Sequence, residues 1–90
     1  MPIQIQIHPI YRVYTDRQTS VFVDGTSVID CLRKLVTQFP LLQKELFDKD
    51  GTLSQIPVIF RNNKVVKENS LNEPVSPTDI IRVDLFLSGG

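Results

Sequence analysis

Hydrophobic and polar residues alternate at the start of the chain. Within residues 3–8, isoleucine occupies every second position and the residues between are polar, a period of two that predicts a strand with one buried face. Pro9 interrupts this strand because proline cannot donate to a sheet ladder. The polar residues 15–19 predict a turn, and residues 21–23 predict the returning strand of a hairpin.

A helical pattern follows the hairpin. Ser27 can cap a helix through its side-chain oxygen, and Asp30 places a negative charge in the first turn. The apolar residues recur at spacings of four, three and four, which form one stripe: Val28, Leu32, Leu35 and Phe39. Pro40 ends this helix. Residues 41–47 predict a short second helix, because Leu42, Leu46 and Phe47 stand at helical spacing.

The second half of the chain predicts three more strands. Residues 56–61 are rich in β-branched and aromatic side chains, and Asn62-Asn63 makes a tight turn into residues 64–66. Residues 80–87 predict the last strand. One of its faces carries Ile81, Val83 and Leu85, and the other carries Ile80, Arg82, Asp84 and Phe86.

The order of elements is therefore hairpin, helix, short helix, hairpin and strand. One main helix packed across a mixed sheet buries the helical stripe and the apolar strand faces together. Parallel pairing of the first and last strands at the centre completes an α+β fold of the ubiquitin-like β-grasp type. The 90 residues make one domain, and we expect residues 1–87 to form it and residues 88–90 to form a flexible tail.

Charge and composition exclude several classes of protein. The formal net charge is zero, whereas duplex binding needs clustered Lys and Arg, so we expect no nucleic-acid partner. No apolar run approaches the roughly 18 residues of a membrane helix. The N-terminus also lacks the features of a signal peptide. The single cysteine, Cys31, forms no internal disulfide, so the expected location is the reducing cytoplasm.

Few residues are suited to catalysis. Cys31 lies beside the apolar stripe of the predicted helix, where a free cysteine behaves as a small hydrophobe. His8, the single histidine, ends the polar face of the first strand and is expected at the surface. Residues 48–51 resemble the start of a calcium loop, but the later ligands do not fall at the required positions. We therefore expect no enzymatic activity, no bound metal and no bound cofactor.

The sequence ends in Ser88, Gly89 and Gly90, directly after the last predicted strand. Glycine has no Cβ and tolerates most backbone angles, so such a tail can thread a narrow channel into another enzyme's active site. Extended, these three residues reach roughly 10 Å beyond the domain. Glycine pairs also end chains incidentally. The signal gains weight here from the β-grasp strand that precedes it.

Five segments together carry a family resemblance: residues 27–32, the Phe39-Pro40 pair with its following Leu42, Leu46 and Phe47, residues 50–53, residues 59–64 and residues 87–90. Through them almost the whole chain resembles the ubiquitin-like sulfur carriers. That family includes the small subunit of molybdopterin synthase, the thiamine carrier and the carriers of thiocarboxylate-dependent amino-acid synthesis. The chain departs from it at Thr78, where glycine is common, and within residues 85–87, where many members have proline.

The resemblance implies a carrier that catalyses nothing itself. An adenylating enzyme similar to those that activate ubiquitin uses ATP on the carboxylate of Gly90, and sulfide or a persulfide converts it to a thiocarboxylate. The sulfur then passes to a synthase or sulfhydrylase, and the free carrier is a monomer. The residues expected to contact these partners are Phe60, Arg82, Phe86 and Leu87, unless loops cover them.

The resemblance also suggests a pathway. Thiamine carriers are shorter and lack the second helix, whereas residues 11–15 and 19–21 are similar to those of carriers for cysteine-type or homocysteine-type amino-acid synthesis. We expect that pathway first and molybdopterin synthesis second. Two rivals stay open: a ubiquitin-like protein modifier joined through Gly90 to lysines, and an interaction domain whose diglycine is incidental.

Overall fold

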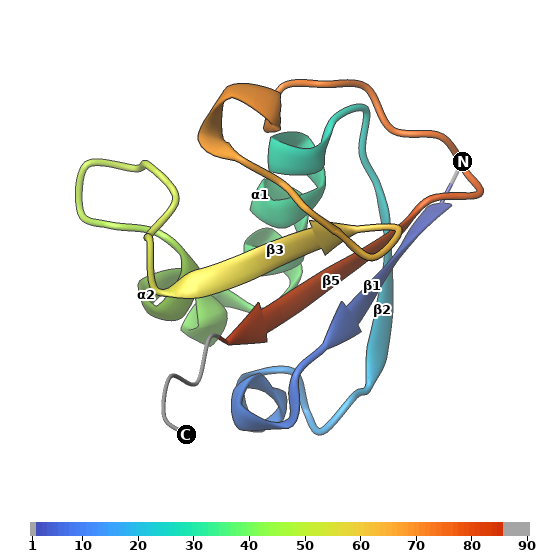
Figure 1. Cartoon of the computed structure of the whole chain (residues 1–90). Helices are drawn as coiled ribbons and strands as arrows, with labels where there is room; N and C mark the ends of the chain where they lie inside the picture. Colours follow the sequence, from blue (N-terminus) through green and yellow to red (C-terminus); the bar gives the residue numbers. More distant parts are fainter. Residues whose placement is uncertain (1, 86–90) are drawn as a thin grey trace, which may run out of the picture.

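The first and last strands pair in parallel at the centre of a five-stranded sheet (Figure 1). The structure, a computed structural model, describes residues 2–85. Its elements, with η marking short 3₁₀ helices, are β1 (Pro2–Ile7), η1 (Pro9–Tyr14), β2 (Ser20–Asp24), α1 (Val28–Gln38), η2 (Pro40–Leu42), α2 (Gln43–Leu46), β3 (Pro57–Arg61), β4 (Lys64–Val65), η3 (Glu68–Ser70) and β5 (Ile80–Leu85).

The strand order is β2-β1-β5-β3-β4. β1 is antiparallel to β2 and parallel to β5, while β3 is antiparallel to both β5 and β4. Helix α1 lies across one face of this mixed sheet (Figure 1). This is the β-grasp arrangement, and the predicted fold class is confirmed.

The main helix begins and ends where the sequence predicts. The hydroxyl of Ser27 accepts a hydrogen bond from the backbone N–H of Asp30 at 3.1 Å, and the Asp30 carboxylate accepts one from the N–H of Thr26 at 2.9 Å. The first bond satisfies an N–H group that the first turn leaves without a helical partner. The second ties Thr26, which precedes the cap, to that turn. The helix ends at Gln38, before Pro40.

The core fills the space between α1 and the sheet. Buried strand residues alternate with exposed or half-buried ones, as a one-sided sheet requires. The fully buried side chains of largest volume are Ile3, Ile5, Ile7, Leu32, Leu35, Leu42, Leu46 and Ile81. Cys31 belongs to the same core. No helix within residues 2–85 has the length and apolar character needed to cross a membrane.

Gly25 lies where the chain passes from β2 to α1. A Cβ at this position would collide with Sγ of Cys31 and would also press on the Cys31 backbone. Glycine is therefore needed at position 25 for the strand and the helix to approach this closely. The sequence pattern alone indicated only the end of a strand at this position.

Two segments differ from the pattern-based expectation. Residues 9–14 were expected only to interrupt the sheet, but they form the helix η1. His8 caps it, since its Nδ1 accepts from the N–H of Ile10 at 3.1 Å, and proline suits the first turn because its missing N–H would have no helical partner. The expected second helix over residues 41–47 is a 3₁₀ turn continued by the four-residue α2.

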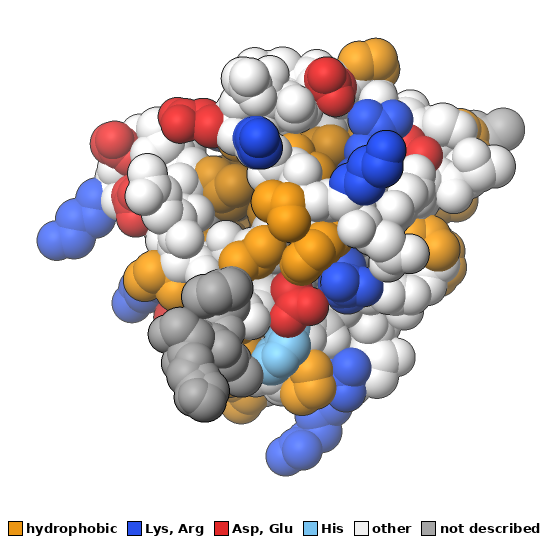
Figure 2. Space-filling model, in the orientation of Figure 1, with side chains coloured by type: hydrophobic (Ala, Val, Ile, Leu, Met, Phe, Trp, Pro, Cys, Tyr) orange, Lys and Arg blue, Asp and Glu red, His pale blue; other side chains and the backbone are white. Residues whose placement is uncertain are grey.

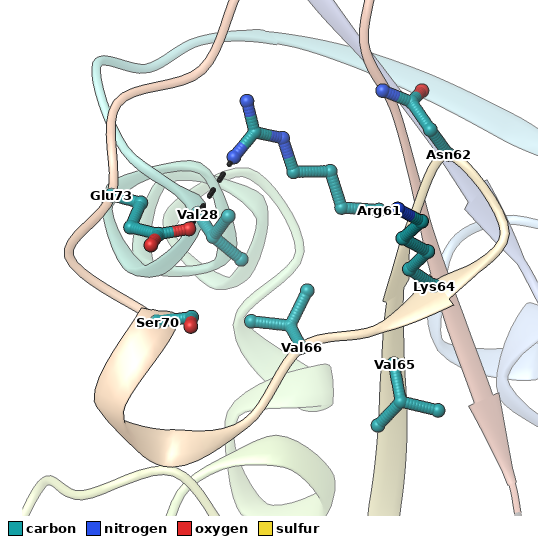
Figure 3. Close-up of a pocket in the computed structure, with 8 residues that line it drawn as sticks. All are labelled: Val28, Arg61, Asn62, Lys64, Val65, Val66, Ser70 and Glu73. Atoms are coloured by element: carbon teal, nitrogen blue, oxygen red, sulfur yellow. Dashed lines mark ion pairs between the residues drawn. The ribbon is translucent and has the colours of Figure 1, made fainter.

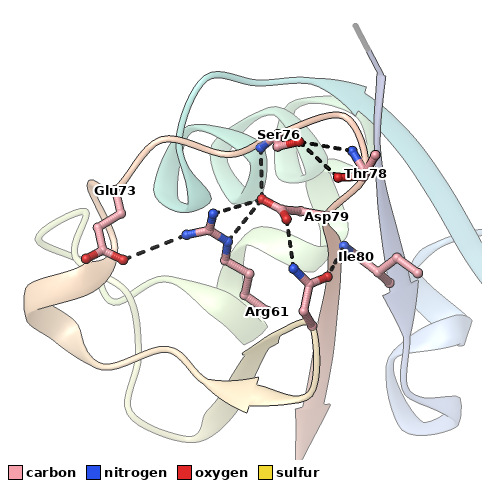
Figure 4. Close-up of polar contacts among 7 residues, drawn as sticks. Arg61, Glu73, Ser76, Thr78, Asp79 and Ile80 are labelled. Atoms are coloured by element: carbon pink, nitrogen blue, oxygen red, sulfur yellow. Dashed lines mark hydrogen bonds and ion pairs between the residues drawn. The ribbon is translucent and has the colours of Figure 1, made fainter.

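A buried carboxylate joins the second hairpin to the start of β5 (Figure 4). Asp79 accepts hydrogen bonds from the N–H of Ser76 at 2.8 Å, from Nδ2 of Asn62 at 2.7 Å and from Nε of Arg61 at 3.0 Å. The N–H of Ile80 in turn donates to Oδ1 of Asn62 at 2.9 Å. The hydrogen bond from Ser76, with that from Asn62 and the Arg61 charge, holds the pKa of Asp79 below its usual value. This network ties the 62–63 turn to β5.

Candidate functional site

The face of the sheet opposite α1 carries the candidate contact surface. Phe60 on β3 and Arg82 on β5 are paired directly across the two strands. The central carbon of the Arg82 guanidinium lies 4.3 Å from the centroid of the Phe60 ring, within cation–π range. Both side chains are half-buried. The structure thus places these two predicted contact residues together on the outer face.

Polar groups contact Arg82 from both directions along β5. Nε of Arg82 donates to Asp84 at 3.1 Å, and Nη1 reaches Oδ1 of Asn63 at 3.4 Å. Oδ1 of Asp84 lies 3.7 Å from Nε2 of His8. His8 was expected only as a surface residue, yet it both caps η1 and approaches Asp84. The sequence signal that would have indicated the cap is a polar residue directly before a proline.

Apolar side chains also lie on the outer face of the sheet. Figure 2 shows hydrophobic groups gathered near the centre of this face, with basic groups beside them and an acidic group next to the histidine below. Val58 lies on the same face as Phe60, and Ile80 exposes much of its side chain on β5, two residues before Arg82. Phe22 is exposed on edge strand β2, which β1 separates from β5. A surface of this mixed character is typical of a protein contact.

Two shallow grooves lie beside this face. The first, about 380 Å³, lies between β4 and η3 (Figure 3). Arg61 lines this groove, and its guanidinium forms ion pairs with Asp79 at 2.9 Å and with Glu73 at 3.7 Å. The second, about 520 Å³, adjoins His8, Arg12 and Arg82. Within residues 2–85, no three His, Cys, Asp or Glu side chains come together as metal ligands would.

Cys31 lies in the core and not in either groove. Burial, and then the nearby Asp30 charge, raises the pKa of its thiol to about 11. The thiol is therefore protonated at neutral pH, and a protonated thiol is a poor nucleophile. The sequence predicted that Cys31 acts as a small hydrophobic residue of the core, and its position agrees with that prediction.

β5 is the last strand that the structure describes. Leu85 pairs with Pro57 of β3, and the N–H of His8 donates to the carbonyl of Val83 at 2.9 Å, so the ends of β1 and β5 lie together. The predicted contact residues Phe86 and Leu87, and the tail residues 88–90, lie outside the described residues. Their role stays a prediction.

No protein-family model matches the chain. Over 62 residues, or 69% of its length, it is 37% identical to the mitochondrial GrpE protein homolog 1 of Arabidopsis thaliana. The chain spans only about a fifth of the length of that curated relative, 20% of which is matched.

Solved structures match along the full length. SAMP1 from Haloferax volcanii superposes with a TM-score of 0.86 at 24% identity, covering 100% of both chains. A chain of the BexX/CysO complex from Amycolatopsis orientalis gives a TM-score of 0.84 at 19% identity, covering 98% of this chain and 99% of that one. The chain has the ubiquitin-like β-grasp fold. A chain from the complex of molybdopterin-converting factor subunits 1 and 2 of Helicobacter pylori shares this β-grasp at a TM-score of 0.65 and 19% identity, with 100% of both chains covered.

Proposed function

We propose that this β-grasp protein is a sulfur carrier whose Gly90 carboxylate is adenylated and converted to a thiocarboxylate. One observation carries the proposal: the central strand of a ubiquitin-like sheet is followed, five residues after Leu85, by a Gly-Gly end. The likeness to structures that include CysO and a molybdopterin-converting factor supports it. In this proposal Gly90 is the mature carboxyl terminus.

The chemistry requires an activating partner because a carboxylate is a poor electrophile. An oxygen of the Gly90 carboxylate attacks the α-phosphorus of ATP, and pyrophosphate leaves. Sulfide or a persulfide sulfur then attacks the acyl carbon, and AMP leaves with the electron pair of the broken C–O bond; a persulfide must afterwards be reduced by a thiol to release the thiocarboxylate. All of these steps take place in the partner's active site, so the chain itself contributes no catalytic group.

The folded body presents the tail in a defined direction. β5 is paired on both sides, to β1 and to β3, so its end cannot swing independently of the sheet. The five residues after Leu85 span at most about 17 Å when extended. A partner that takes up Gly90 must therefore contact the body, and the Phe60 and Arg82 surface offers an aromatic and an arginine of the kind that dominates binding energy.

Among the pathways, cysteine-type or homocysteine-type amino-acid synthesis is the first candidate for the recipient of the sulfur, and molybdopterin synthesis is second. The likeness to the CysO complex supports this order, with a TM-score of 0.84 against 0.65 for the molybdopterin-converting factor. The expected second partner is a sulfhydrylase or synthase.

Conjugation to other proteins is the second candidate function. Its specific support is the likeness to the small archaeal modifier protein 1 of Haloferax volcanii. A modifier would use the same fold and the same adenylation, but a lysine amine would displace the activated group and an amide would form at Gly90.

Intact-mass spectrometry tests the proposal. The chain is incubated with ATP, sulfide and each ubiquitin-activating-type adenylating enzyme of the source organism. A sulfur carrier gains the mass difference between sulfur and oxygen, and a variant that lacks Gly90 does not. High-mass conjugates that survive reducing denaturation would favour the modifier. Absence of both products with every enzyme would contradict the proposed function.

A further inference from the structure

Helix η1 has two chemically different faces. A 3₁₀ helix repeats every three residues, so side chains three apart share a face. Tyr11 and Tyr14 turn toward the core, where Tyr11 is buried and Tyr14 packs against the buried cluster. Ile10 and Val13 share the other face and are 52% and 71% exposed. The helix therefore presents an apolar ridge to solvent.

Hydrogen bonds at both ends of η1 hold Ile10 and Val13 in their exposed positions. Nε of Arg12 donates to the carbonyl of Ile7 at 3.0 Å, and His8 caps the first turn. Thr15 is fully buried, and its hydroxyl reaches the carbonyl of Gln18 at 3.1 Å. Because polar contacts hold η1 at both ends, the ridge formed by Ile10 and Val13 has a fixed position on the surface.

Two further exposed apolar residues lie at the same end of the sheet. η1 packs against η2, on which Leu41 is 73% exposed. Ile56 is 69% exposed and directly precedes Pro57, the partner of Leu85 across β3 and β5. In Figure 1 the head of the β5 arrow lies between η1, in blue, and α2, in green. We call Ile10, Val13, Leu41 and Ile56 the apolar collar.

The collar holds most of the large apolar side chains that the described residues expose. Four of the seven exposed large hydrophobic residues belong to it; the other three are Phe22, Val65 and Ile80, all on strands. Large exposed hydrophobic groups that gather around one feature mark a contact surface more often than scattered ones do. Here the feature is the end of the strand that precedes Gly90.

We propose that the collar docks on the rim of the channel through which a ubiquitin-activating-type adenylating enzyme takes up the carboxyl terminus. This inference rests on the proposed function. Only five residues follow Leu85, a reach of at most about 17 Å. When the Gly90 carboxylate meets ATP inside an enclosed site, the end of β5 stands at the channel mouth, and the collar loses its water against an apolar rim.

The adenylating enzyme is the occupant because both candidate functions require it. A carrier and a modifier are each adenylated before their fates diverge, whereas only a carrier meets a sulfur acceptor. The collar is also separate from the surface around Phe60 and Arg82, since it lies at the end of the sheet and not on its outer face. It would therefore set how closely the body approaches the enzyme.

Carrier-dependent exchange of pyrophosphate into ATP measures this docking. The intact chain is assayed with each ubiquitin-activating-type adenylating enzyme of the source organism, beside Val13→Gln and the double variant Ile10→Gln with Val13→Gln. The matched control is Phe22→Gln, which removes an apolar side chain that is 59% exposed on edge strand β2, separated from β5 by β1. Thermal melting checks that all variants fold.

We expect the double variant to raise the KM for the chain about tenfold and to keep kcat within about twofold. A rise of this size is the effect expected when one or two buried apolar contacts are lost. Phe22→Gln should leave KM unchanged. An unchanged KM in the double variant, or an equal rise in Phe22→Gln, would overturn the collar inference alone. Absence of exchange with the unaltered chain would overturn the proposed function. If the double variant is adenylated normally but delivers its sulfur more slowly, the collar contacts the sulfur-accepting enzyme and the inference is overturned.

Discussion

The Arg82 guanidinium stacks over the Phe60 ring at 4.3 Å, across the pairing of β5 with β3. This contact joins the two residues into one surface, with Asp84 and Asn63 holding the guanidinium from either side. Because stacking orders the long arginine side chain before any partner arrives, less conformational entropy is lost on binding.

Arg82→Gln should weaken binding to the adenylating enzyme more than tenfold, as loss of an interfacial arginine commonly does. The half-exposed pair should contribute no more than about 1 kcal/mol to folding stability. Isothermal titration and urea unfolding measure the two effects. Lys64→Gln, which removes an exposed cation from edge strand β4, is the control. Equal losses of affinity in both variants would point to net charge and not to this surface.

Asp79→Asn should destabilise the fold by about 1–3 kcal/mol at neutral pH, because three hydrogen-bond donors lose their charged acceptor in a partly buried network. The folded pKa of Asp79 is lowered, so its stabilisation is present above the unfolded pKa, near 4, and is lost as pH falls through the folded value. Urea unfolding of both proteins from pH 7 to pH 2 should therefore show their difference shrinking below about pH 4. A difference that is constant with pH would exclude the carboxylate charge as its cause.

Gly25→Ala should destabilise the fold by about 1–3 kcal/mol, since the added methyl group meets Sγ and the backbone of Cys31. Adding Cys31→Ala removes the sulfur but not the backbone contact. The loss caused by Gly25→Ala should therefore be smaller in the Cys31→Ala background, which a double-mutant cycle from urea unfolding would measure. Strict additivity of the two substitutions would rule out this contact as the reason for glycine.

Cys31 should resist alkylation by iodoacetamide at pH 8 in the native state and react rapidly in urea, because burial raises its pKa to about 11. The folded state favours the protonated thiol, so this contribution to stability is complete below the unfolded pKa, near 8.5, and declines as pH rises toward 11. Cys31→Ala should lack this decline. Rapid native-state alkylation would show that the thiol is accessible.

Local signals account for the elements that were predicted correctly. The isoleucine alternation of β1, the cap at Ser27 with the apolar stripe of α1, and the paired asparagines between β3 and β4 each act within a few residues. Asn62 and Asn63 both adopt positive φ, of 51° and 70°, as a two-residue hairpin turn requires. Short-range periodicity and turn chemistry were therefore sufficient for the fold class.

Tertiary structure alone decided which residues meet. The pairing of Phe60 with Arg82 depends on the register of β3 against β5, and the need for Gly25 depends on how closely α1 approaches β2. The outward ridge of η1 depends on which face of this helix packs against the core. These contacts join segments that are distant in sequence, so no local pattern contains them. The sequence by itself determined the order of the strands, the place of the main helix and the diglycine end. Packing determined the surface that surrounds the strand leading to that end.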